Sequence, residues 1–119
     1  MDFLYDRENL CFSVEQNDIR FSCEQPTPSL KAFANRLARK YRDRLPFLAE
    51  FVVKSDEFLE TYGVLSADEF MALLKEMTIP WVFLHSGHHG TIAYCDSDYV
   101  IEFAFTGDFE TFDDLSVDS

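Results

Sequence analysis

Positive charge is missing from the last third of this sequence, where no Lys or Arg follows Lys75. The whole chain has 22 acidic residues against 10 basic ones, a formal net charge of −12. Such a field repels nucleic acids and anionic membranes and attracts basic surfaces. We therefore expect neither direct nucleic-acid binding nor membrane binding, although a protein that imitates nucleic acid would carry the same charge.

Glycine, cysteine and long apolar runs are also scarce. The four glycines form neither a GxGxxG nor a Walker spacing, which argues against a nucleotide cofactor. The three cysteines include no Cys-x-x-Cys pair, as expected for reduced thiols in the cytosol. No apolar run approaches the roughly 20 residues of a membrane span, and residues 1–6 lack the pattern of a signal peptide. We expect a soluble cytoplasmic protein that needs no cofactor.

What the chain does contain is ample material for a core. Its 119 residues are 47% hydrophobic and include thirteen Phe, which predicts a single domain over residues 1–119. Residues 10–24 alternate apolar with polar side chains around a polar turn, and this pattern predicts a β-hairpin. The expected cross-strand pairs are Val14 with Ile19, Phe12 with Phe21, and Leu10 with Cys23.

A helical period begins at Leu30 and continues to Leu45, preceded by Thr27 or Ser29 as possible caps. We expect Pro46 to end or kink this helix, because proline lacks the backbone donor. The opposite helix face could contact RNA, or it could neutralise acidic strands of the same domain. That face carries six of the ten basic residues: Lys31, Arg36, Arg39, Lys40, Arg42 and Arg44.

Two more helices and three strands are expected after Pro46. The second helix would cover residues 47–62 with Phe47 in the core, and a capping box of Ser66 and Glu69 would start the third. Strands are predicted over residues 79–85, 91–95 and 99–106, followed by an acidic C-terminal segment, 107–119. In the last hairpin Cys95 is expected opposite Tyr99, so that Thr91, Ala93 and Cys95 face inward with Ile101 and Phe103. The predicted fold class is α+β, an antiparallel sheet of about five strands, two N-terminal and three C-terminal, packed on one face by three helices.

The residues best suited to metal chemistry are three histidines, His85, His88 and His89, with Cys95 one strand later. Zinc needs imidazoles and thiolates at tetrahedral spacing, but adjacent histidines in a glycine-flanked turn rarely converge on one ion. No residue is therefore assigned as catalytic or metal-binding, and we expect the protein not to be an enzyme. A small metal-dependent hydrolase built on this loop remains the alternative.

Acidic residues dominate the chain beyond the histidine loop, with eight carboxylates and no base between Asp96 and Asp118. Solubility alone does not require one sign of charge, whereas a docking surface for a basic protein benefits from it, with aromatic side chains supplying affinity. The predicted partner-binding residues are Asp96, Asp98, Tyr99, Glu102, Asp108, Phe109, Glu110, Asp113 and Asp114.

In size, charge and α+β character, and in the acids Asp96, Asp98, Glu102, Asp108, Glu110, Asp113 and Asp114, the chain resembles the small acidic immunity proteins of bacterial contact-dependent toxin systems. The resemblance implies a cytoplasmic protein that binds a cognate toxin domain, often a basic nuclease, and neutralises it by occlusion. A phage-type inhibitor that imitates nucleic acid has the same profile. The sequence leaves the partner and the oligomeric state open.

Overall fold

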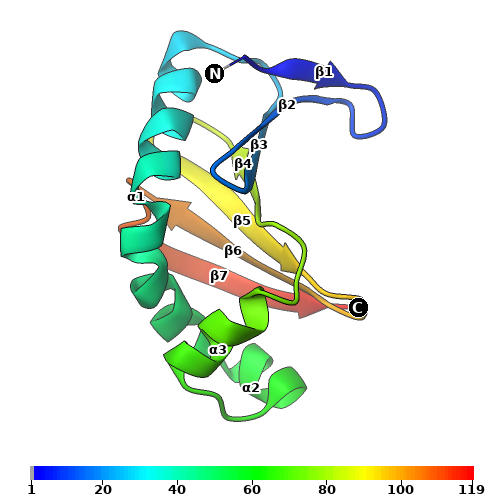
Figure 1. Ribbon diagram of the computed structural model, residues 1–119, viewed down its shortest axis with the longest axis vertical. Helices are drawn as coiled ribbons and strands as arrows, with labels where there is room; N and C mark the ends of the chain where they lie inside the picture. The colour runs from blue at the N-terminus through cyan, green and yellow to red at the C-terminus, as the bar shows by residue number, and fades with distance from the viewer. Residues whose placement is uncertain (1) are drawn as a thin grey trace.

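The computed structural model describes residues 2–119, in which one mixed sheet of seven strands is packed against three helices. Figure 1 shows the helices gathered on one side of the sheet. The α+β class and the three helices agree with the prediction. The elements in order are β1 (Leu4–Asp6), β2 (Cys11–Gln16), β3 (Ile19–Cys23), α1 (Pro28–Val53), α2 (Asp56–Tyr62), α3 (Ala67–Leu74), β4 (Trp81–Leu84), β5 (His89–Cys95), β6 (Val100–Thr106) and β7 (Thr111–Asp118).

The strands follow one another across the sheet in chain order, from β1 to β7. The prediction of about five antiparallel strands is wrong in two respects. There are two additional edge strands, β1 and β7, and β3 pairs with β4 in parallel. All three helices lie in the connection between β3 and β4, and a long crossover of this kind allows two neighbouring strands to run the same way. The acidic segment 107–119 is thus largely a strand of the sheet.

Helix α1 runs through Pro46 to Val53, so the predicted start of a second helix at residue 47 is wrong. Only the last part of the predicted range 47–62 forms a separate helix, α2. Thr27 caps its start, and its side chain accepts a hydrogen bond from the Leu30 backbone N–H at 3.2 Å. The apolar stripe continues past the proline at Leu48, Ala49 and Val52, all buried. Phe47, expected in the core, is 55% exposed. Burial of the continuing stripe offsets the roughly 3 kcal/mol that an internal proline costs.

Helix α2 is only seven residues long and ends at Gly63, which adopts a positive φ of 81°. The predicted capping box of Ser66 and Glu69 is confirmed at the start of α3, with hydrogen bonds in both directions. Phe70 of α3 is buried against the sheet, where its ring meets Tyr94 edge to face. These short helices close the end of the core that α1 leaves open.

The N-terminal hairpin has a shorter turn than predicted. Val14 pairs with Phe21 where Ile19 was expected, because the turn consists of Asn17 and Asp18 alone, both with positive φ. Two consecutive positive φ values suit the tight hairpin turn that matches the twist of the strands. The shift is an even number of residues, so the inward face is still the predicted one. Leu10 is an exception, since it lies in the preceding turn and is exposed.

The last hairpin differs from its prediction by one residue, and this reverses one strand. Tyr94 pairs with Ile101, and Ala93 with Glu102. A slip of one residue exchanges the two faces of a strand, so Ile92 and Tyr94 are buried, whereas Ala93 lies on the other face with Thr91 and Cys95. The sheet therefore has a helix-covered face, which holds the core, and a second face that no helix of residues 2–119 covers. We call this second face the open face.

Candidate interaction surface

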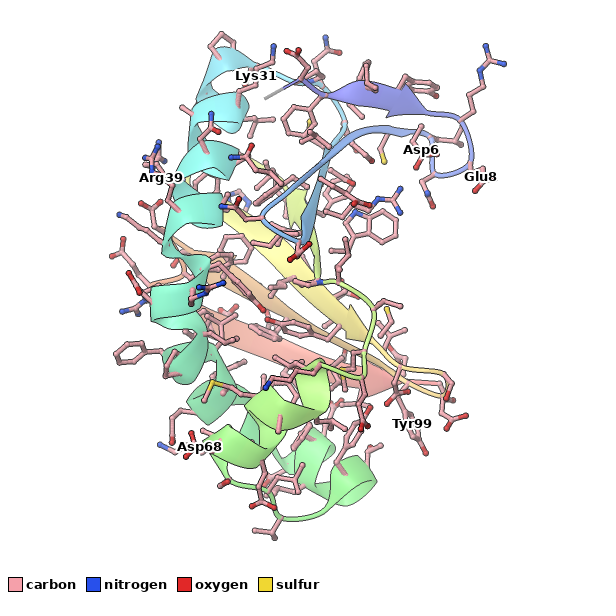
Figure 2. The ribbon with its side chains drawn as sticks, in the orientation of Figure 1. Asp6, Glu8, Lys31, Arg39, Asp68 and Tyr99 are labelled. Carbon is pink, nitrogen blue, oxygen red and sulfur yellow. The ribbon has the colours of Figure 1, made fainter. Side chains whose placement is uncertain are left out.

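The structure does not bring the nine predicted partner-binding residues together. Residues 96–99 form the turn between β5 and β6, while residues 107–110 form the turn at the other end of β6. The seven residues of β6 separate the two turns by about 20 Å at the usual rise per residue. In Figure 2, Tyr99 lies at the end of the sheet away from α1. The predicted acidic patch is thus divided between the two ends of β6, and its remaining members lie within β6 and β7.

The turn at residues 107–110 is bound to α1. The carboxylate of Asp108 accepts hydrogen bonds from Lys40 Nζ at 2.7 Å and Arg36 Nε at 3.3 Å, and its side chain is only 12% exposed. Burial alone would raise the pKa of Asp108, but these two hydrogen bonds outweigh it and hold the pKa below its usual value. Arg44 Nε donates to the backbone carbonyl of Phe109 at 2.9 Å. Part of the basic helix face therefore neutralises and orders this turn.

Phe109 is fully buried, so its prediction as a partner contact is wrong. Its ring lies 4.7 Å from the Phe105 ring and meets Tyr41 edge to face at 5.8 Å. The acidic neighbours of Phe109 made it look like part of a docking surface, although its role is to anchor the turn in the core. Glu110, on the same turn, is exposed.

The turn at residues 96–99 also has an internal role. Asp96 accepts hydrogen bonds from Tyr62 Oη at 2.7 Å and from the backbone N–H groups of Asp98 and Tyr99. The Tyr62 hydrogen bond is the main reason that the pKa of Asp96 is lowered, and the backbone donors act in the same direction against partial desolvation. Tyr99 packs edge to face on Tyr62 and is half-buried, whereas Asp98 is exposed. Asp96 and Tyr99 therefore shape the turn.

Glu102 and Asp113 are the predicted residues that the register places on the open face, in the same cross-strand rows as Trp81 and Phe83. One row across the sheet runs from Trp81 through Ala93 to Glu102, and the next runs from Phe83 through Thr91 and Ala104 to Asp113. Asp118, paired with Val100, adds a third exposed acid. Asp114, the last of the nine, is exposed in the bulge of β7, with a positive φ of 55°.

Trp81 is held rigidly on this face. Its indole Nε1–H donates to Ser22 Oγ at 2.6 Å, and Ser22 is in turn hydrogen-bonded with Ser13 at 2.9 Å. The Arg20 guanidinium lies 4.3 Å from the Trp81 ring centroid and forms an ion pair with Asp6. Side-chain hydrogen bonding from Asn9 is the main cause of the lowered pKa of Asp6. From the sequence, Trp81 is expected only as part of a strand, because the face it occupies depends on pairings that the sequence does not reveal.

The open face carries an excess of negative charge. Arg20 is the only Lys or Arg within the seven strands, and its charge is balanced by Asp6. The exposed acids on this face are Glu15, Glu102, Asp113 and Asp118. Between β4 and the acids of β6 and β7 lie the short side chains of Thr91, Ala93 and Ala104. An ordered Trp–Arg pair on an acidic face has the composition of a protein-binding surface.

The histidine side chains of the loop at residues 85–89 form hydrogen bonds with side chains nearby in the sequence. His85 Nε2 is hydrogen-bonded with Thr91 Oγ1 at 2.8 Å, and Ser86 Oγ with His89 Nδ1 at 2.6 Å. Cys95 lies at the opposite end of β5 from His89. Within residues 2–119, no three His, Cys, Asp or Glu side chains are grouped so that they could hold a metal ion.

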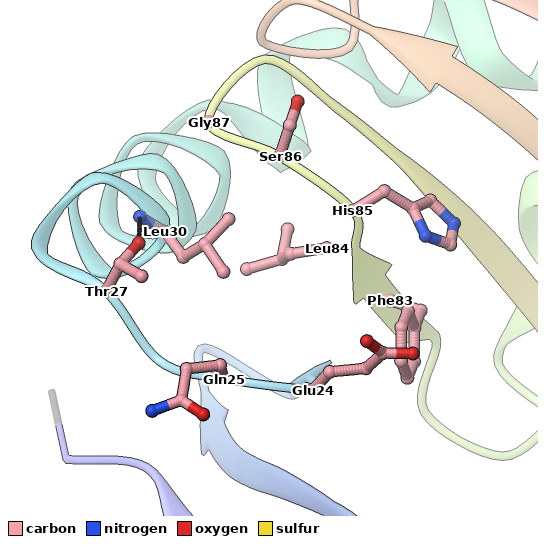
Figure 3. Close-up of a pocket in the computed structure, with 9 residues that line it drawn as sticks. All are labelled: Glu24, Gln25, Thr27, Leu30, Phe83, Leu84, His85, Ser86 and Gly87. Carbon is pink, nitrogen blue, oxygen red and sulfur yellow. Dashed lines mark hydrogen bonds between the residues drawn. The ribbon is translucent and has the colours of Figure 1, made fainter.

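A small pocket of about 420 Å³ adjoins this loop at the start of α1. Leu30 of α1 and Leu84 of β4 face each other across it, while His85 points away from them (Figure 3). Glu24 and Gln25 line its other side. Two polar side chains at the pocket already have hydrogen-bond partners, since His85 is bonded with Thr91 and Ser86 with His88 and His89.

Comparison of the chain with family models, with curated proteins and with solved structures yields no match. Among residues 2–119, no helix combines the length and apolar character needed to cross a membrane. The function of the open face is therefore inferred from its own residues, Trp81 and the surrounding acids above all.

Proposed function

We propose that this protein is an acidic inhibitor of the immunity or antitoxin type, which binds a basic toxin domain in the cytoplasm and neutralises it by occlusion. In this proposal the protein performs no reaction of its own. The contact surface is the open face, centred on Trp81 and bounded by Glu102, Asp113 and Asp118. This surface replaces the continuous C-terminal patch expected from the sequence.

The observation that carries the proposal is the ordered pair of Trp81 and Arg20 on a sheet face whose other exposed charged residues are acidic. Trp and Arg are enriched among residues that dominate binding energy, especially where they are already held in place before the partner arrives. The half-exposed Phe83 enlarges the aromatic area next to Trp81. The acids around them would attract a basic partner and increase its association rate.

Charge reversal tests the surface directly. Glu102→Lys with Asp113→Lys changes two exposed acids on the open face, and Glu60→Lys with Glu76→Lys changes two exposed acids elsewhere by the same total charge. We expect the open-face pair to slow association with the partner about tenfold or more at low salt, and the control pair about threefold or less. Trp81→Ala should weaken binding about thirtyfold, mainly through faster dissociation.

The candidate partner is the product of the reading frame next to this gene. The proposal requires that its product contains a basic domain that stops cell growth, and that co-expression of this protein restores growth. The Glu102→Lys, Asp113→Lys variant should fail to restore growth, while the control variant succeeds. A harmless neighbouring product, or equal rescue by both variants, contradicts the proposal. Circular dichroism of each variant checks that it is folded.

A further inference from the structure

A groove of about 920 Å³ lies on the helix-covered side of the sheet. Its walls come from α1, from α3 and its connection to β4, and from the turn between β2 and β3. Tyr41 and Tyr94 lie at its base, where their hydroxyl groups share a hydrogen bond of 2.6 Å. The apolar side chains along the groove are Leu45, Met71, Leu74, Met77 and Ile79.

The rim of the groove carries basic side chains without partners. Arg39, Arg42 and Lys75 line it, all are exposed, and within residues 2–119 none of them forms an ion pair or a side-chain hydrogen bond. Figure 2 shows Arg39 projecting from α1. Asp18 and Asp43 lie along the same groove, so three bases face two acids. The groove is thus locally positive in a chain whose net charge is −12.

The shape and lining of the groove suit a polypeptide segment. Asn17 Nδ2 donates to the Ala38 carbonyl at 3.1 Å, which fixes the β2–β3 turn against α1 and keeps that end of the groove formed. Ile79 is 39% exposed, so apolar surface is available to a partner. Met71 and Met77 have flexible, polarisable side chains, which adapt to apolar groups of different shapes.

We propose that this groove binds an acidic peptide segment of a second protein. An apolar side chain of the segment would contact Met71 and Ile79, and flanking carboxylates would pair with the rim bases. Arginine favours this role because its guanidinium can hold a carboxylate with two parallel hydrogen bonds. The proposal goes beyond the inhibitor function, because the groove and the open face lie on opposite sides of the sheet and either could exist without the other.

Nuclear magnetic resonance titration of the whole labelled protein tests the groove. The probe is a short capped peptide that alternates glutamate with leucine. We expect saturable amide shifts confined to the lining of the groove, residues 17–18, 38–45 and 71–80 and Tyr94. Arg39→Glu with Arg42→Glu should weaken binding about tenfold or more. Lys31→Glu with Lys54→Glu, an equal charge change near the two ends of α1 and outside the groove, should weaken it about twofold or less. Ile79→Ser should weaken it about threefold.

Several outcomes would overturn the proposal. These are the absence of saturable shifts at millimolar peptide, equal binding of a peptide with lysine in place of glutamate, and unchanged binding to the Arg39→Glu, Arg42→Glu variant. Laurate offers an apolar tail with one carboxylate, so groove shifts with laurate but not with the peptide would assign the site to a fatty acid. The co-expression growth assay, applied to the Arg39→Glu, Arg42→Glu variant, distinguishes the two proposals. A variant that still restores growth but binds no peptide shows that the inhibitor function does not depend on the groove.

Discussion

Replacing Phe109 by alanine tests whether the acidic turn after β6 belongs to the core or to a docking surface. The side chain is fully buried between the Phe105 and Tyr41 rings. Truncating a buried Phe to Ala costs about 3–5 kcal/mol, since it combines lost burial with a cavity. A domain of this size is stable by about 5–15 kcal/mol. We therefore expect a large fall in the guanidinium midpoint at pH 7, with the free energy of unfolding reduced by about 3–5 kcal/mol.

Two companion variants sharpen the measurement. Phe112, on the edge strand β7, is only half-buried, so Phe112→Ala should cost less, about 1–3 kcal/mol. Phe109 has a positive φ of 59°, which glycine adopts more easily than alanine. The Phe109→Gly variant should therefore be at least as stable as Phe109→Ala, whereas glycine is usually the less stable of the two. If Phe109→Ala lost under about 1 kcal/mol, the usual range for surface changes, the core assignment of this turn would be refuted.

Three further predictions concern α1 and its contacts. Pro46→Ala should raise the free energy of unfolding by about 1–3 kcal/mol in a chemical denaturation experiment, because Pro46 is exposed and the new residue restores a backbone donor. Because the pKa of Asp108 is lowered in the folded state, its contribution to stability is present above pH 4, roughly, and is lost as the pH falls through the folded pKa. Asp108→Asn should flatten that part of the stability–pH curve. Burial raises the pKa of Tyr41 to about 12, so in an ultraviolet titration this tyrosine should ionise at higher pH than an exposed one. Tyr94→Phe removes the hydrogen-bond partner of Tyr41 and should lower the free energy of unfolding by about 1–2 kcal/mol.

The sequence predicted the elements better than their pairing. Helical periodicity predicted the inward residues of α1 from Leu30 to Leu45, which lie in the core or pack against it, and the capping box at Ser66 predicted the start of α3. Pro46 misled because the rule for proline is local, while burial of Leu48 and Val52 depends on the whole helix lying across the sheet. The same helical period, continued past Pro46, includes both residues and indicates one continuous helix.

Register was the main obstacle to predicting the site. Both faces of β5 offer plausible apolar residues, so alternation could not decide whether Ala93 or Tyr94 faces the core. The turn decides, because Asp96 binds the backbone N–H groups of residues 98 and 99 and sets the offset of the whole hairpin. Trp81 lies next to Ala93 through the pairing of β4 with β5, and next to Arg20 through the parallel pairing with β3. The β5–β6 offset then places Glu102 in the same row.

The distribution of charge follows from the same geometry. Acids that are close in the sequence are separated in space. Asp98 and Asp108 lie at opposite ends of β6, where each has different neighbours. Asp108 is neutralised by α1, whereas Glu102 and Asp113 form no ion pair with any of residues 2–119 and share a face with Trp81. Unbalanced charge beside a fixed aromatic side chain suits recognition better than charge on an extended tail, since a fixed surface loses less conformational freedom when a partner binds. The absence of bases beyond Lys75 therefore matters most on β6 and β7, where it leaves the open face acidic.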